Sequence, residues 1–410
     1  MPELIISHTR GLLPVYNLAR HFSDRDMSFE TTIYFDPQDR LPRLAARCRL
    51  DRLHRQLMRR HFDGIDRAKV HLFPFPDLLY LSATRLTTSA PRRARVSMVR
   101  NRWFDRHVAA RVRRQRPRVV IAHDSAARHT FEAARAVGAT TILSQAIGHH
   151  ATAQRVFEAE RRRYPEFADT LPAAVAGRDV TEAIEEVRLA DHVVGGSPYV
   201  RQSVIDVGCP PDRAHVAPYA ADTDKFHPRE ATAVTDRDRP LRVLFVGQVG
   251  LRKGVPYLLE AFRRLQRPGV ELLLVGPMLG SGEALKPYAG LFTHLPSVPH
   301  DEMPALMRSA DIFAFPSLHE GSAVVIFEAL ASGLPVVVTP NSGSVVEDDL
   351  EGYVVPIRDV DALADRLARL IDDPALRSRM GAAARKTAMT WTWERYCHTF
   401  DTLVSDALAS

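Results

Sequence analysis

The feature that most constrains the fold is a regular alternation of short, apolar, β-rich runs with helix-length amphipathic segments along the whole chain. Such alternation is typical of α/β domains in which helices connect parallel strands. In the first half we expect strands at 3–7, 31–35, 118–122, 140–144, 192–196 and 215–219, and helices at Leu12–Phe22, Leu41–His61, Val99–Arg114 and Ser197–Val207. In the second half we expect strands at 241–247, 270–276, 311–317, 334–339 and 352–356, helices from Gly254 and Ser322, and two closing helices.

Between the two series, the chain loses its periodicity and becomes polar over 222–240, which is typical of a linker. A chain of 410 residues also exceeds the usual size of one hydrophobic core. We therefore predict a first domain over 1–225, a linker over 226–240 and a second domain over 241–390. Each domain is long enough for a Rossmann-like, doubly wound parallel sheet, and the ligand-binding edges of two such sheets can face one another across a cleft.

Composition limits the class of protein. An apolar fraction of 45% and a charged fraction of 25% are typical of a soluble globular protein. Cys48, Cys209 and Cys397 lie far apart, which argues against a disulfide framework or a zinc site and indicates a reducing compartment. The N-terminal residues make a poor signal peptide, and no apolar run reaches the ~18 residues that a membrane span needs. We therefore expect a cytoplasmic protein.

The net charge of +6 conceals a strongly basic region. Residues 40–118 contain 22 Lys and Arg against five Asp, a local charge of +17. Such a surface attracts nucleic acid, anionic lipid or phosphorylated substrates, and charge alone does not choose among them. The alternative is a set of solvated, arginine-rich helix faces with no partner.

The stretch FPSLHEGSAVVIFEALASGLPVVVTP, residues 315–340, contains two candidate site residues. The strand breaks at Pro316, and a helix is predicted from Ser322, its N-cap, to Ala331. Glu320 precedes this helix and Glu328 lies near its middle, roughly 12 Å away at ~1.5 Å of rise per residue. The helix N-terminus between them would favour a phosphate. For an arbitrary pair at this spacing, two unrelated surface acids are the commoner explanation.

A second candidate lies in LFVGQVGLRKG. A strand ends at Gly247 and a helix opens at Gly254, with Arg252 and Lys253 at its entrance, where they would neutralise a bound anion. The stretch fits neither the Walker loop nor the G-x-G-x-x-G dinucleotide motif. Together the two stretches fit the binding of a nucleotide diphosphate-sugar.

These residues resemble a known family. Two stretches are similar to the donor domain of family 4 retaining glycosyltransferases (glycosyl transferases group 1). They are VG-x5-KG after a strand and, further along the chain, ADIFAFPSLHEGSAVVIFEALASGLPVVVTPNSGSVVEDDLEGYVVP. The end of the first domain of these enzymes is resembled by a third stretch, RLADHVVGGSPYVRQSVIDVGCPPDRAHVAPYAADTDKFHP. The similarity therefore covers roughly residues 182–373. The resemblance implies the GT-B fold, with the acceptor bound by the first domain and the donor by the second. It also implies that the last helix, over 391–410, crosses back onto the first domain.

The resemblance also implies a role for each matching residue. Glu320 would face the transferred sugar and support charge at the reacting carbon, and Glu328 would bind the ribose. Lys253 would hold the diphosphate and stabilise its departing charge. The residues whose backbone the sugar and phosphates would approach are Gly247, Gly321, Ser322 and Ala323.

Two departures from the family pattern concern the nucleotide. The family usually has arginine after the strand-ending glycine, where this chain has Gln248, and Arg252 is the natural substitute. The base is expected to contact the strand end at Leu295 to Val298, although Pro296 stands in place of the usual glycine.

The first domain places histidines at the carboxyl ends of predicted strands. His123 follows one strand, and His149 and His150 follow the next, after Gln145. The resemblance implies an active-site histidine on the second loop, which either His149 or His150 could supply. A structural role is an equal alternative for each histidine.

The first βα turn contains Gly11, and the resemblance implies that the donor phosphates or the acceptor approach the chain there. His8 and Arg10 would line the same opening of the site.

Four D-x-D triplets occur, at 24–26, 222–224, 236–238 and 359–361. Their places in the linker and at a helix start favour capping or solvation over metal binding. We therefore expect no metal and no cofactor, with Arg252 and Lys253 supplying the positive charge.

We predict a metal-independent retaining glycosyltransferase that moves a sugar from a nucleotide diphosphate-sugar to a hydroxyl acceptor. No side chain stands out as a nucleophile, as expected if the acceptor attacks from the leaving-group side. The alternatives are a GT-B enzyme that epimerises or hydrolyses nucleotide sugars, and a basic nucleic-acid-binding module, for which no base-reading motif is present. The basic region at 40–118 suggests a lipid-linked or anionic acceptor and an anionic membrane surface as partner.

Overall fold

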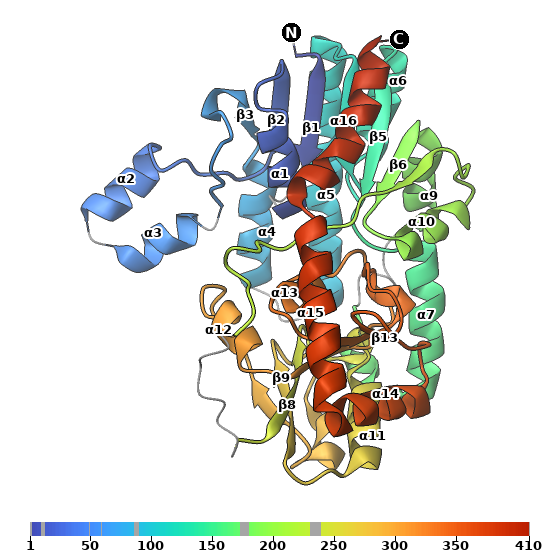
Figure 1. Ribbon diagram of the computed structural model, residues 1–410. Helices are drawn as coiled ribbons and strands as arrows, with labels where there is room; N and C mark the ends of the chain where they lie inside the picture. The colour runs from blue at the N-terminus through green and yellow to red at the C-terminus, as the bar shows by residue number, and fades with distance from the viewer. Residues whose placement is uncertain are drawn as a thin grey trace.

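The computed structural model describes residues 2–9, 13–48, 50–58, 60–85, 90–172, 180–229 and 239–409. It contains two parallel β-sheets, one above the other in Figure 1, with helices packed around both. The predicted α/β class, with two doubly wound sheets, is confirmed.

The first sheet has seven parallel strands in the order β3-β2-β1-β4-β5-β6-β7. The strands are β1 (Leu4–His8), β2 (Met27–Thr31), β3 (Val70–Leu72), β4 (Val119–His123), β5 (Thr140–Gln145), β6 (His192–Gly195) and β7 (Ala214–Val216). Leu4 and Ile6 of β1 join one apolar cluster and Ile5 joins another, because successive side chains of a strand point to opposite faces. This sheet is therefore buried on both faces, as parallel sheets usually are.

The predicted strand at 31–35 is wrong, since β2 occupies Met27–Thr31, and β3 was not predicted. Three buried residues of β2, Ser28, Glu30 and Thr31, are polar. Ser28 Oγ donates a hydrogen bond to Glu30 Oε1 at 2.6 Å, and Arg111 Nε pairs with the same oxygen at 2.7 Å. These internal partners allow polar side chains to be buried, and an apolar pattern does not reveal them.

The helices before the linker are α1 (Leu13–His21), α2 (Arg40–Arg47), α3 (Asp51–Met58), α4 (Phe75–Arg85), α5 (Ala90–Gln115), α6 (Arg128–Ala136), α7 (His150–Arg163), α9 (Val180–Leu189) and α10 (Pro198–Ile205), with 3-10 turns η1 (Arg67–Lys69) and η2 (Pro165–Thr170). The predicted single helix at 41–61 is thus two helices. The N–H of Leu50 bonds to the carbonyl of Ala45 at 2.9 Å and closes α2. The helix predicted at 99–114 is the second part of the 26-residue α5.

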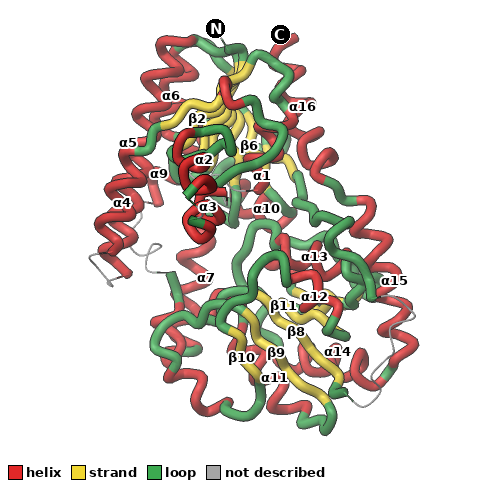
Figure 2. Tube along the Cα trace, turned by 90° about the vertical axis from the view of Figure 1, so that its left-hand side faces the viewer, coloured by secondary structure: helices red, strands yellow, loops and turns green. Residues whose placement is uncertain are grey.

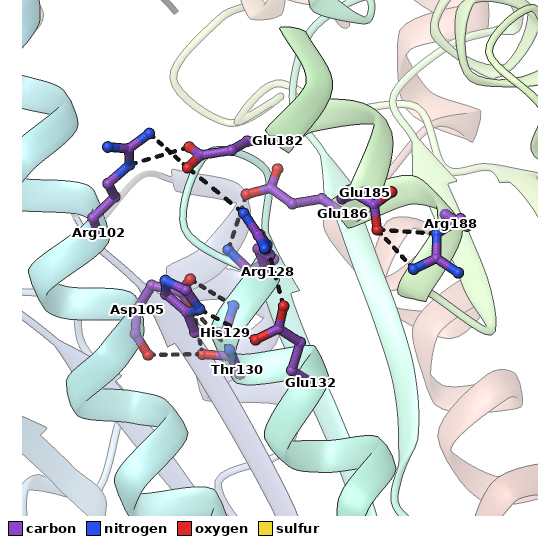
Figure 3. A network of polar contacts seen from close by, with 11 residues as sticks. Arg102, Asp105, Arg128, His129, Thr130, Glu132, Glu182, Glu185, Glu186 and Arg188 are labelled. Carbon is purple, nitrogen blue, oxygen red and sulfur yellow. Dashed lines mark hydrogen bonds and ion pairs between the residues drawn. The ribbon is translucent and has the colours of Figure 1, made fainter. Parts of the chain in front are cut away.

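Figure 3 shows how α6 is held by its neighbours, α5 and α9. The residue before the helix, Ala127, has no side chain that can cap the backbone. Asp105 of α5 accepts hydrogen bonds from the N–H groups of His129 and Thr130 at 2.8 and 2.9 Å. Glu186 of α9 accepts one from the N–H of Ala127 at 3.2 Å. Carboxylates of two other helices therefore cap α6 and fix the loop that follows β4.

The second sheet has six parallel strands in the order β10-β9-β8-β11-β12-β13. They are β8 (Leu241–Val246), β9 (Val270–Val275), β10 (Thr293–Leu295), β11 (Ile312–Phe315), β12 (Val336–Val338) and β13 (Gly352–Val354), and the helices are α11 (Val255–Leu265), α12 (Met303–Arg308), α13 (Val324–Ala331), α14 (Val360–Asp372), α15 (Pro374–Thr390) and α16 (Trp393–Ala409). All five predicted strands are confirmed, and the two predicted closing helices are three.

Two segments besides the linker connect the domains. Helix α15 runs along the second domain and α16 then packs Tyr396, Phe400 and Val404 onto a core of the first sheet (Figure 1). Helix α7 and η2 lie within the predicted first domain but pack on the second, because Phe157 and Phe167 join the core of the second sheet. Part of the predicted first domain thus packs into the second.

Candidate functional site

The candidate site lies where the strand order reverses in the second sheet, between β8 and β11. β8 is followed by Gly247 and the 3-10 turn η3 (Leu251–Lys253), and β11 by the loop 316–323. The N–H of Leu318 donates to the carbonyl of Arg252 at 2.9 Å, so the two loops lie side by side. Parallel α/β sheets bind their ligands at such reversal points.

Glu320 is the centre of a buried ion cluster. Its Oε1 pairs with Arg252 Nη1 and Lys253 Nζ, and accepts a hydrogen bond from Ser317 Oγ at 3.3 Å. The side chains of the three charged residues are between 11% and 14% exposed. Arg252 Nη2 also donates to Gln248 Oε1 at 3.2 Å, so the guanidinium reaches the side chain at the position where the family has its arginine.

The cluster holds more positive than negative charge. Burial raises the pKa of Glu320, but the charges of Lys253 and Arg252 outweigh burial and hold that pKa below its ordinary value. Burial lowers the pKa of Lys253, and repulsion from Arg252 adds to this effect against the attraction of Glu320. Two cations face one carboxylate, so a bound anion would relieve their repulsion.

The loop that carries Glu320 packs against the first domain. The N–H of Gly148 donates to the carbonyl of Glu320 at 3.0 Å, and Ser197 Oγ donates to the carbonyl of Gly321 at 2.6 Å. A Cβ atom added to Gly321 would lie 1.8 Å from the carbonyl oxygen of Ala146. Glycine at 321 is therefore required by a close approach of two backbones, one from each domain.

The start of helix α13 differs from the prediction. Its N-cap is Ala323, with no side-chain cap, and the helix begins at Val324. Ser322, the predicted N-cap, has its hydroxyl oxygen turned toward the first domain, where it accepts a hydrogen bond from the N–H of Tyr219 at 3.1 Å. An interdomain contact therefore replaces the local cap.

Glu328 lies on the wall of a cavity of about 470 Å³ where the two domains meet. Arg20 of α1, Lys225 just before the linker, His300 and Trp393 line the same cavity. Glu328 is 8% exposed, and burial raises the pKa of its carboxyl to about 7. Within the part of the chain that the structure describes, this carboxylate has no ion-pair partner and Glu320 is not on the cavity wall. The two glutamates thus occupy different environments.

His149 and His150 lie next to the Glu320 loop, at the start of α7. His149 is fully buried and acts as the N-cap of α7, since its Nδ1 accepts a hydrogen bond from the N–H of Ala151 at 3.2 Å. Its own N–H donates to Ser203 Oγ at 2.8 Å. These contacts give His149 a structural role, whereas His150 is the first residue of the helix.

A histidine that we did not single out from the sequence lies closer to the ion cluster. His319 precedes Glu320, is 2% exposed, and its Nδ1 shares a hydrogen bond of 2.6 Å with the hydroxyl of Tyr199. Burial lowers the pKa of His319 to about 4. Its signal in the sequence was its position beside Glu320, but its partner Tyr199 lies 120 residues away.

The residues expected near the nucleotide base lie at the sheet edge. Leu295 ends the edge strand β10 and is 37% exposed, and Val298 packs partly buried against the second core. His300, two residues further on, reaches the cavity that contains Glu328. The segment therefore leads from the sheet edge to the cavity wall.

Other first-domain candidates lie at the carboxyl ends of β1 and β4. The rings of His8 and His123 meet edge to face, with centroids 4.4 Å apart. Burial lowers the pKa of His123 to about 3. Gln145 donates to the carbonyl of Ile147 at 2.9 Å and holds its loop. Gly11 and Arg10 lie outside the described residues.

Two of the four D-x-D triplets are seen to make local contacts. Asp222 Oδ1 accepts from the N–H of Asp224 at 3.2 Å, and Asp359 caps α14 by accepting from the N–H of Ala362 at 2.8 Å. Among the described residues, no three His, Cys, Asp or Glu side chains gather as metal ligands would. The triplet at 236–238 lies outside those residues.

A helix that crosses a bilayer must be long and almost entirely apolar. Within the described ranges, no helix combines the length and the apolar character needed to cross a membrane.

Comparison with known sequences shows what the part of the chain that contains this site is similar to. Residues 229–387 match the sequence model of the family described as "Glycosyl transferases group 1". The chain is 32% identical over 253 residues to D-inositol 3-phosphate glycosyltransferase of Xylanimonas cellulosilytica, covering 54% of this chain and 60% of the relative. It is 32% identical over 227 residues to a GDP-mannose-dependent alpha-(1-6)-phosphatidylinositol monomannoside mannosyltransferase of Mycolicibacterium smegmatis, covering 50% and 59%. The matches thus span less than two thirds of these relatives.

Comparison with solved structures covers the whole chain. The crystal structure of Anabaena Alr3699/HepE in complex with UDP superposes with a TM-score of 0.66 over 99% of this chain and 100% of that one, at 16% identity. At this identity the similarity establishes the fold alone. Together with the two parallel sheets, it shows that the chain has the GT-B fold.

Proposed function

We propose that this protein is a retaining glycosyltransferase that moves a sugar from a nucleotide diphosphate-sugar to a hydroxyl acceptor without a metal ion. The observation that carries the proposal is the cluster of Arg252, Lys253 and Glu320 at the reversal point of the second sheet. These residues and Glu328 lie within the range that matches glycosyl transferases group 1.

Each charged residue then has a distinct task. The diphosphate binds beside Arg252 and Lys253, whose positive charge stabilises the departing phosphate and takes the place of a metal ion. Glu328 accepts hydrogen bonds from the ribose hydroxyls. Glu320, held by its two cations, faces the sugar. The acceptor attacks from the leaving-group side, which retains the configuration at the sugar carbon.

The comparisons support a nucleotide-sugar donor. The HepE structure contains UDP, and the name of the mycobacterial relative specifies GDP-mannose. That name also specifies a lipid acceptor, a phosphatidylinositol monomannoside. Given the charge of +17 over residues 40–118, we propose a lipid-linked or anionic acceptor for this chain, presented at an anionic membrane surface.

A thermal-shift screen against UDP-, GDP-, ADP- and TDP-sugars tests the donor site. One donor at 100 times its Kd should stabilise the protein by ~2.7 kcal/mol. Glu328→Gln should lose most of this stabilisation, while Glu302→Gln, at an exposed position, should keep it. If none of the four donors stabilises the protein, the assignment of the cavity is wrong.

The reaction itself is tested with the donor that binds. Transfer to an added acceptor in EDTA, with the anomeric configuration of the product read by NMR, checks metal independence and retention together. Turnover at the same rate without an acceptor would instead indicate hydrolysis or epimerisation.

A further inference from the structure

Helix α4 turns its apolar side outward. Phe75, Leu78 and Leu79 share one helix face and are 59%, 55% and 50% exposed. On the opposite side, Asp77 is 3% exposed and pairs with Arg100 of α5 at 3.5 Å. A surface helix normally buries its apolar side and exposes its acids, so α4 has the reverse arrangement.

Helix α5 extends this apolar surface. The ring centroid of Trp103 lies 5.8 Å from that of Phe75, and Trp103 is 39% exposed. Val99, one turn before Trp103, is 63% exposed. We define the α4–α5 patch as Phe75, Leu78, Leu79, Val99 and Trp103. Figure 2 shows α4 and α5 side by side along the outer edge of the first domain.

Arginines flank the α4–α5 patch. Arg95 lies one turn before Val99 and Arg106 one turn after Trp103, and both are exposed on the same face of α5. The 26 residues of α5 contain nine arginines and one acidic residue, Asp105, which is buried. The charge that α5 presents to solvent is therefore positive.

This combination identifies the class of partner. A bilayer with anionic headgroups offers phosphates to the arginines and an apolar boundary to the exposed leucines, and tryptophan rings favour that boundary. Nucleic acid would pair with the arginines but would leave Phe75, Leu78 and Leu79 in water. A second copy of this chain would bring the same positive charge against the patch, which disfavours self-association.

We propose that the α4–α5 patch docks this protein on a bilayer that carries anionic headgroups. The apolar side chains enter the interfacial layer, and Arg95 and Arg106 contact the headgroups. The inference rests on the proposed function, since docking through this patch would bring the acceptor-binding domain to a lipid-linked acceptor. Vesicle binding needs no donor and donor binding needs no vesicle, so the proposals of sugar transfer and of membrane docking can fail separately.

Co-sedimentation of the full chain with vesicles tests the proposal. Phosphatidylcholine vesicles are compared with vesicles that contain about one third phosphatidylglycerol, at low and high salt. The wild type should bind the anionic vesicles, and both Leu78→Gln/Leu79→Gln and Arg95→Glu/Arg106→Glu should weaken this binding roughly tenfold or more. The matched control, Leu350→Gln/Met389→Gln, changes residues of similar exposure in the second domain and should bind like the wild type.

Insertion is measured with brominated lipids, which quench tryptophan fluorescence. The chain has three tryptophans, and the other two, Trp391 and Trp393, lie at the start of α16 or just before it. Quenching should be present in the wild type and lost in Trp103→Phe.

Five results would overturn the proposal. The first four are no binding to anionic vesicles, equal binding to neutral ones, quenching that persists in Trp103→Phe, and binding to duplex RNA or DNA in place of vesicles that depends on the arginines but not on the leucines. A dimer that forms without vesicle binding and is lost in Leu78→Gln/Leu79→Gln would also assign the patch to self-association.

Discussion

Glu320 and Glu328 are eight positions apart in the sequence and each is 8% exposed, yet they differ in the charged groups around them. Glu320 meets two cations from a neighbouring loop, and their charges lower its pKa. Glu328 faces a cavity, and burial raises its pKa to about 7. The first acid has its counter-charge built into the chain. The second has none among the described residues and gains most from a ligand that donates hydrogen bonds.

The largest expected effect concerns the first acid. Glu320→Ala leaves Arg252 and Lys253 buried without their carboxylate, and breaking a buried pair in this way costs about 3–5 kcal/mol of unfolding free energy. Urea unfolding at pH 7 measures the loss. Glu302→Ala, at an exposed position, is the control and should change stability by less than about 0.5 kcal/mol. A loss below about 1 kcal/mol for Glu320→Ala would mean that water reaches the cluster.

Glu328→Gln should stabilise the protein, in contrast to Glu320→Ala, and in a pH-dependent way. The pKa of Glu328 is about 7 in the folded protein against an ordinary value of 4.5, so the folded state holds the extra proton between these values. The wild type therefore loses stability as the pH rises from 4.5 to 7, by up to about 3 kcal/mol.

Glutamine has no proton to lose, so the variant avoids this loss. Its advantage over the wild type in urea unfolding should be near zero at pH 4.5 and about 3 kcal/mol at pH 8. Comparing the two proteins at each pH cancels the titration of all other groups. An advantage that is the same at both pH values would show that the carboxyl of Glu328 is not buried as the structure has it.

The packing of the Glu320 loop on the first domain gives a smaller effect. Gly321→Ala places a Cβ atom against the carbonyl oxygen of Ala146 and should cost about 1–3 kcal/mol through overpacking. The distinguishing measurement is hydrogen exchange of the Gly148 N–H, which bonds to the carbonyl of Glu320 and should exchange faster in the variant.

Gly138→Ala is the matched control for this change. Gly138 has a φ of +79° and open space around its Cβ position, so the variant strains the backbone without a clash. It should lose stability but leave exchange at Gly148 unchanged. If the Gly148 N–H exchanged faster in both variants, a general loss of stability would explain the result for Gly321→Ala.

The two halves of the chain also differ in how well the sequence predicted them. The central strands β11 and β12 of the second sheet are apolar throughout, IFAF and VVV, and all five strands predicted in this sheet are present. In the first sheet, β2 has the buried polar residues Ser28 and Glu30, and the prediction fell on the wrong segment. A buried polar side chain depends on partners such as Arg111, which lie far away in the sequence.

The contacts of the candidate site could also be predicted from the sequence only in part. The meeting of Glu320 with Arg252 and Lys253 could be predicted, because both segments follow strands of one sheet. The contacts of Ser322 with Tyr219 and of His319 with Tyr199 could not, because they depend on how the two domains are placed. The packing of α7 into the second core also depends on that placement.

The smallest expected effect tests whether Glu328 serves the donor. If the carboxylate accepts hydrogen bonds from the ribose, only its ionised form binds well, and a pKa of about 7 makes binding weaker at low pH. The Kd of a UDP-sugar should rise about tenfold between pH 8 and pH 6, which is about 1.4 kcal/mol. A UDP-sugar is a better probe than UDP, because a terminal phosphate itself ionises near pH 6.

Variants separate the contribution of Glu328 from that of its neighbour in the cavity. His300 lines the same cavity as Glu328, so a variant of each residue is needed to assign the change in binding to one of them. Calorimetry of the wild type, Glu328→Gln and His300→Gln at both pH values distinguishes the two. Weaker binding at pH 6 should persist in His300→Gln and disappear in Glu328→Gln, which should bind weakly at both. If Glu328→Gln kept the wild-type affinity and pH dependence, the donor would not contact this acid.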